Sequence, residues 1–200
     1  MTKQRNEGRH RISGITGIGA QLRRLFGARE GAGAVEFAIV APLLIVGYLG
    51  AYEISVAWSF ANKVGRSAAT IADAIARRTN VTGAVMDDMT KIASNIMAPY
   101  TADNYRLKIT GIQVDKDGNA TVAWSRDEQR AAPYVKGSPV SLPAAMREPE
   151  TFIVRAELSL PYRILTLIPG ADASGERIFI DRTNFSLERQ GKSITCSDCG

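Results

Sequence analysis

Residues 31–61 read GAGAVEFAIVAPLLIVGYLGAYEISVAWSFA, and this stretch decides how the rest of the chain can be organised. From Phe37 to Ala61 it contains one charged side chain, Glu53. These twenty-five residues would form an α-helix about 37 Å long, which is enough to cross a hydrocarbon layer of about 30 Å with some tilt. Backbone groups in lipid must bond within their own segment, so the stretch predicts a membrane-spanning helix, in which Pro42 is tolerated.

Two carboxylates accompany the apolar run. Glu36 lies at its edge and Glu53 lies inside it. Ionisable side chains at membrane depth are costly and are usually there for function. The alternative for Glu36 is an interfacial residue that suits the positive end of the helix dipole. The alternative for Glu53 is a residue that already reaches the outer headgroups.

The segment GAGAVEFAIVAPLL, residues 31–44, resembles the start of TadE-like pseudopilins. This family, with its TadE-, TadF- and TadG-like members, serves the tight-adherence (Flp) branch of type IV pilus systems. The resemblance implies that a prepilin peptidase cuts after Gly31 and makes Ala32 the first mature residue. Glu36 then stands fifth and is followed by the expected aromatic residue, Phe37.

The resemblance also implies a role and partners. The expected role is that of a membrane-anchored minor pseudopilin in pilus assembly, with other Tad pilus subunits and inner-membrane assembly proteins as partners. Register between subunits would depend on Glu36, Pro42 and Glu53. One alternative is an uncleaved single-pass membrane protein that displays a periplasmic binding domain. Another is a secreted domain cut after residues 59–61, although the apolar run is long for a signal peptide.

The basic charge of the chain is concentrated at its start. The formal net charge is +5, and residues 1–31 hold seven basic and two acidic side chains, whereas the rest holds eighteen of each. A basic segment before an apolar span favours a cytoplasmic N-terminus. We therefore predict a basic cytoplasmic leader, a bacterial inner-membrane location, and a C-terminal domain in the periplasm or outside the cell. A balanced domain gives no sign of a nucleic-acid-binding face.

Beyond the apolar run, hydrophobic periodicity predicts an α+β fold, which agrees with the pilin-like layout that the resemblance implies. The long N-terminal helix continues to about Arg78, and a second helix, capped by Thr82, buries Val85, Met89, Ile92 and Ile96. Both helices would pack on an antiparallel sheet of about four strands. The predicted parts are the leader at 1–31, the transmembrane helix at 32–61, a helical region at 62–98, a β domain at 99–195 and a cysteine-containing tail at 196–200.

Alternating apolar residues predict the strands of the β domain. They cover about 105–114, with a bulge after Gly111, and about 120–124, 151–162 and 177–187. The sequence DKDGN, residues 115–119, predicts a hairpin turn; as a calcium loop it lacks the later glycine and glutamate. Residues 126–150 predict a long proline-containing loop with a short helical turn at 143–147.

The polar residue types of the chain argue against an enzyme. The sole histidine, His10, falls in the leader, so the exported domain has no histidine for a catalytic triad or a metal site. Cys196 and Cys199 are the two cysteines, and an oxidising compartment favours a disulfide between them or with another chain; a free pair is the alternative. We predict no catalytic residue, metal, cofactor or small-molecule substrate.

Overall fold

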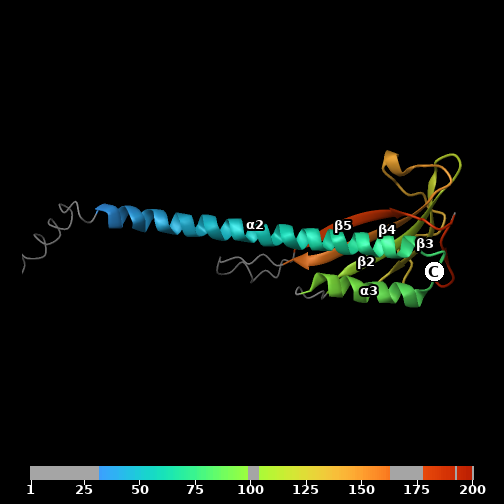
Figure 1. Cartoon of the computed structure of the whole chain (residues 1–200), viewed down its shortest axis with the longest axis horizontal. Helices are drawn as coiled ribbons and strands as arrows, with labels where there is room; N and C mark the ends of the chain where they lie inside the picture. The colour runs from blue at the N-terminus through green and yellow to red at the C-terminus, as the bar shows by residue number, and fades with distance from the viewer. Residues whose placement is uncertain (1–31, 99–103, 163–177, 192, 200) are drawn as a thin grey trace, which may run out of the picture. The chain divides into compact units, whose positions relative to one another are not determined.

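The computed structural model of the chain describes residues 32–98, 104–162, 178–191 and 193–199 (Figure 1). The chain divides into an N-terminal unit that ends at Ala51 and a C-terminal unit that begins at Tyr52. Helix α2 belongs to both. The elements in chain order are α2 (Ala32–Ala76), β1 (Asn80–Val81), α3 (Gly83–Met97), β2 (Arg106–Val114), β3 (Ala120–Asp127), the short 3-10 helix η2 (Ala144–Met146), β4 (Phe152–Tyr162), β5 (Ile178–Leu187) and β6 (Thr195–Cys196).

The predicted α+β fold is confirmed. A long apolar helix and a second helix accompany a four-stranded antiparallel sheet in the order β3-β2-β4-β5. Figure 1 shows α3 and the C-terminal part of α2 along the sheet. On α2, Val64, Ala68, Ile71 and Ile75 recur at helical spacing and are fully buried there. The helix ends at Ala76, two residues before the predicted end.

Helix α3 begins directly after the predicted cap, but its buried side chains match the predicted stripe only in part. The Thr82 hydroxyl accepts a hydrogen bond of 3.4 Å from the N–H of Val85. Of the predicted stripe, Met89 is buried, whereas Val85, Ile92 and Ile96 are half-buried. The other buried side chains, Met86, Ala93 and Met97, each lie one position later. The helix has two adjacent apolar stripes, and the unbranched methionines adapt to the irregular space against the sheet.

The central strands have the predicted register break. The pairing of β2 with β3 shifts between Gly111 and Ile112, whereas β2 pairs with β4 without interruption. The side chain of Asp115 closes the following turn by accepting hydrogen bonds of 2.8 Å from the N–H groups of Asp117 and Asn119. Asp115 also accepts a hydrogen bond of 3.0 Å from the side-chain amide of Asn119. This side-chain bond is the largest cause that lowers the pKa of Asp115, and the backbone bonds add to it.

The two faces of the sheet support two apolar clusters. The larger cluster joins α2 and α3 to one face and includes Ile71, Leu107 and Leu158. The smaller one lies on the other face, where Leu142 of the long loop packs on Ile112 and Ile153. Strand β3 extends to Asp127, so the loop begins after that residue and not at position 126.

The C-terminal tail is part of the globular unit. Strand β6 pairs in parallel with β1, with Val81 opposite Cys196, and neither short strand was predicted. Ile194 and Cys199 are buried in the larger cluster. The predicted leader, including Gly31, and the predicted strand start at Arg177 lie outside the described residues.

Candidate functional site

The N-terminal part of α2 has large apolar side chains that face outward. Phe37, Leu43 and Tyr48 are 70%, 73% and 71% exposed, and the neighbouring side chains are similar. The helix from Gly33 to Ala76 is long and apolar enough to cross a membrane. An apolar surface of this extent is unfavourable in water, so it requires lipid or another apolar surface around it.

The predicted assembly residues of the N-terminal unit lie on this helix. Ala32 is the first residue of α2, Glu36 follows one turn later and is exposed, and Pro42 lies inside the helix without ending it. Nothing lies within 4 Å of where side chains would project from Gly47 and Gly50. The small residues allow a second helix to approach closely, and the exposed carboxylate of Glu36 can form an ion pair with a cationic group on that helix.

Glu53 has a partner within its own chain. The Tyr162 hydroxyl donates a hydrogen bond of 2.9 Å to Oε1 of Glu53, and the rings of Tyr162 and Phe60 lie 5.1 Å apart. Glu53 is half-buried in the C-terminal unit, whereas Glu36 belongs to the N-terminal unit. The two acids are therefore in different settings, and Tyr162, at 109 residues from Glu53, gave no signal in the sequence.

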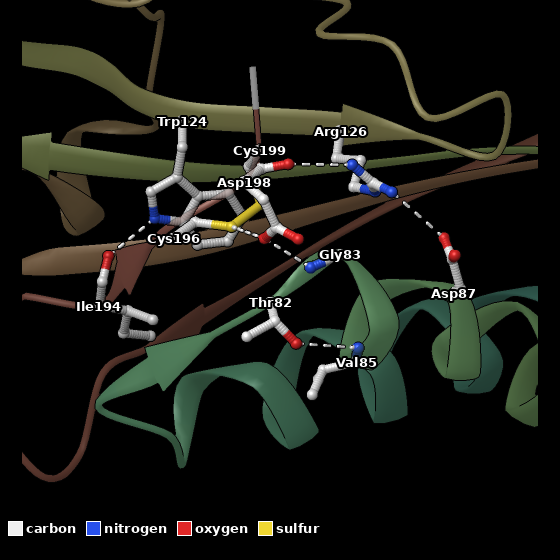
Figure 2. The surroundings of a disulfide bond; sticks show 10 residues. All are labelled: Thr82, Gly83, Val85, Asp87, Trp124, Arg126, Ile194, Cys196, Asp198 and Cys199. Atoms are coloured by element: carbon white, nitrogen blue, oxygen red, sulfur yellow. Dashed lines mark hydrogen bonds and ion pairs between the residues drawn. A yellow bond between two sulfur atoms is a disulfide. The ribbon is translucent and has the colours of Figure 1, made fainter.

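A disulfide joins Cys196 to Cys199 and forms a tight loop in the tail (Figure 2). Between the cysteines, Oδ1 of Asp198 accepts a hydrogen bond of 2.7 Å from the N–H of Gly83, at the start of α3. A carboxylate at this end of a helix satisfies a free N–H group and suits the helix dipole. The tail thus completes the N-terminus of α3.

Side chains of β3 hold the same tail from the sheet. Nε1 of Trp124 donates a hydrogen bond of 2.7 Å to the carbonyl of Ile194, and Nη1 of Arg126 donates one of 3.1 Å to the carbonyl of Asp198 (Figure 2). Arg126 also forms an ion pair of 3.5 Å with Asp87 of α3. Three atoms that could bind a metal, from Cys196, Asp198 and Cys199, lie within 4.8 Å of one another. Because the two sulfurs are joined in a disulfide, we assign this group a structural role.

A polar cluster covers part of the other sheet face. The Tyr134 hydroxyl donates a hydrogen bond of 2.9 Å to Glu157, and Arg155 lies over the Tyr134 ring at 4.7 Å while pairing with Glu157. The pKa of the Tyr134 hydroxyl is raised, mainly because the group is partly buried and secondly because it donates a hydrogen bond to Glu157. These contacts join Tyr134 of the long loop to two residues of β4, which indicates that the cluster fixes the loop on the sheet.

A shallow groove of about 400 Å³ runs between α2 and β5. Small residues of α2 and the side chains of Arg66, Arg182 and Asn184 line it. Among these lining residues there is no carboxylate, thiol or imidazole, so the groove offers no general acid or base.

The comparisons with known proteins concern the first part of α2. Residues 31–73 match the family model described as TadE-like protein. No curated protein and no solved structure matches the chain. The matched residues contain Gly31, Glu36, Pro42 and Glu53 and stop before the sheet. The resemblance seen in the sequence is confirmed over these residues, where the chain is similar to TadE-like proteins.

Proposed function

We propose that this chain is a membrane-anchored minor pseudopilin that takes part in the assembly of a tight-adherence (Flp-type) type IV pilus. One observation carries the proposal: the TadE-like match at residues 31–73 coincides with a continuous apolar helix that has one exposed carboxylate near its start. A helix of this kind can serve first as a membrane anchor and then as the contact between subunits, because both environments are apolar.

Processing is the first step of the proposed mechanism. A prepilin peptidase in the inner membrane hydrolyses the peptide bond between Gly31 and Ala32. The cut removes the basic leader, which until then keeps the N-terminus in the cytoplasm. It also frees the α-amino group of Ala32, which takes up a proton at neutral pH. A positive charge then stands at the start of α2, one helical turn before Glu36.

Subunit register is the second step. The carboxylate of Glu36 at the lipid boundary needs a cationic partner, and the new α-ammonium group of a neighbouring subunit can supply it as two helices come together. A charge left without its partner in a low-dielectric setting costs several kcal/mol, so misaligned subunits are disfavoured. Other Tad subunits and inner-membrane assembly proteins are the proposed partners.

The C-terminal unit fits export from the cytoplasm. Disulfides persist in oxidising compartments such as the bacterial periplasm, and Cys196 and Cys199 form one. Together with the basic leader, this supports an inner-membrane protein whose domain lies on the periplasmic side. The part of the chain that the structure describes suggests no catalytic group, so we propose a structural subunit and not an enzyme.

Cleavage is tested by expressing the full chain with and without a prepilin peptidase and measuring its intact mass. We expect the mass to fall by residues 1–31 only when the peptidase is present. Gly31→Ala should block the cut, and the matched control Gly33→Ala should leave it intact. An unchanged mass in every sample would favour the alternative, an uncleaved single-pass protein that displays a periplasmic domain.

The role of Glu36 is tested in the native cell by counting pili. Glu36→Ala and Glu36→Gln should be cut normally and inserted in the membrane, yet fail to support pilus assembly. Glu148→Gln, at an exposed acid of the long loop, is the control and should assemble normally. Normal piliation by both Glu36 variants would refute the pairing mechanism.

A further inference from the structure

Exposed apolar side chains gather at the end of the sheet where β4 finishes and β5 begins. Tyr162 is paired with Ile178, and Pro161 is paired with Phe179. Ile178 is 48% exposed and Phe179 40%, although Leu158 and Leu160 of the adjoining β4 are 1% exposed. Ile178 and Phe179 are consecutive, so they project to opposite faces and make the sheet end apolar on both sides.

This sheet end lies beside residues 53–60 of α2. Tyr162 donates a hydrogen bond to Glu53, and its ring contacts that of Phe60 in a tilted arrangement, so the last residue of β4 is held beside residues 53–60 of the helix. On the same stretch of α2, Ile54 and Trp58 are each 71% exposed. Exposed apolar side chains thus come from the helix and from the sheet end together.

The position of Glu53 in the apolar run suggests what covers these side chains. Glu36 and Glu53 are seventeen positions apart, or about 26 Å along an α-helix, close to the hydrocarbon thickness of about 30 Å. A bilayer with one boundary near Glu36 therefore has its other boundary near Glu53. Trp58, a few residues beyond, belongs to the residue type that is enriched at membrane interfaces.

The charges nearby suit the headgroup region. The guanidinium of Arg106 lies over the Phe179 ring at 5.1 Å, and Arg106 is itself exposed. A guanidinium can bind phosphate in a bidentate manner while the ring below enters the acyl boundary. The exposed Asp181, two residues beyond Phe179 on β5, is an acidic group on that face, and Glu157 lies further along β4 on the same face.

We propose that the exposed Ile178 and Phe179, at the sheet end beside the buried Tyr162, form a second membrane contact, which rests among the phospholipid headgroups beside α2. The proposal requires that α2 is inserted in a membrane, as in the proposed function, but it does not depend on a role in pili. The contact would hold the domain on the membrane surface, with Glu53 and Tyr162 bonded at the boundary of the bilayer. A domain held in this way has a fixed orientation before it meets a partner.

The test is photo-cross-linking of the full chain in nanodiscs of phosphatidylethanolamine and phosphatidylglycerol. Benzoylphenylalanine replaces Phe179, or in a second variant Ile178, and lipid adducts are counted by mass spectrometry. Leu187 is the matched control, because it lies at the other end of β5 and is also 48% exposed. Leu43, which is 73% exposed on α2, reports insertion of the helix. The disulfide, read from the intact mass, checks folding of each variant.

We expect lipid adducts at positions 43, 178 and 179, with about tenfold less at 187, because an interfacial contact enters only the outermost layer of the bilayer. Adducts at 43 without adducts at 178 and 179 would overturn the second contact and leave the membrane helix in place. Equal yields at 179 and 187 would also overturn it. Absence of adducts at all four positions would refute both the membrane anchor and the second contact. A loss of piliation alone would not contradict the second contact.

Discussion

Gly111 sits where the chain has no room for a side chain. A methyl group on this residue would collide with Cε2 of the Trp124 ring and would approach Cζ of Phe152 to 2.7 Å. Both rings belong to the larger apolar cluster, and Trp124 also bonds to the tail. Gly111 therefore lets two rings from neighbouring strands meet over the backbone of β2, at the position of the bulge.

The substitution Gly111→Ala should lower the free energy of unfolding by about 3 kcal/mol, because overpacking of a close-packed core forces its rings to move. Thermal unfolding of the detergent-solubilised chain measures the effect. Gly65→Ala is the control, since its added carbon would meet Arg182 at an ordinary 3.8 Å and would favour the helix. Equal unfolding midpoints for the two variants would contradict the predicted collision.

The Tyr134 hydroxyl should make stability depend on alkaline pH. Its pKa is raised, so its contribution is complete below the ordinary tyrosine value of about 10 and is lost as pH rises through the raised value. At neutral pH, Tyr134→Phe should lower the free energy of unfolding by about 1 kcal/mol, the usual loss for one hydrogen bond. It should also flatten the fall in stability above pH 10. A parallel fall in the variant and in the unchanged chain would disprove this assignment.

The elements differ in how far the sequence could predict them. The lengths of α2, β2 and β4 follow from periodicity over long segments. The change of phase at Gly111 marks where the pairing of β2 with β3 shifts, but the extra residue, Ala123, lies on β3. Ile112 and Val114 change phase because they face the smaller cluster on the other side of the sheet. The orientation of α3 could not be derived, because two neighbouring apolar stripes were equally suitable and the sheet determined the choice. The contacts of Glu53 with Tyr162 and of Gly83 with Asp198 join residues 109 and 115 positions apart, and no local pattern encodes such pairs.

The tail acts as one element with the start of α3, and its disulfide should stabilise that unit. The double variant Cys196→Ser/Cys199→Ser should lose about 2 kcal/mol, because the bond closes only a short loop. A reducing agent should lower the unfolding midpoint of the unchanged chain and have no effect on the double variant. Ser197→Ala keeps the bond and serves as the control. A midpoint in the unchanged chain that does not respond to reduction would refute this role.

At the scale of the whole molecule, the core and the exposed apolar helix use different residues. The larger cluster begins at Phe60 and includes Val64 and Ile71 of α2, whereas the described residues before Tyr52 contribute nothing to either cluster. The globular unit should therefore fold without the anchor but not without the C-terminal part of α2.

Two truncated chains, each exported with a signal peptide and purified in mild detergent, test this division. Residues 52–200 should unfold cooperatively within about 5 °C of the full chain, since they retain both clusters. Residues 77–200 should fail to fold, because they lack the side chains of α2 that are fully buried on the sheet, among them Val64, Ile71 and Ile75. Protease resistance and circular dichroism measure both outcomes. Non-cooperative unfolding of residues 52–200 would mean that the domain depends on the segment before Tyr52, and α2 could not then be exchanged between lipid and a partner without loss of the fold.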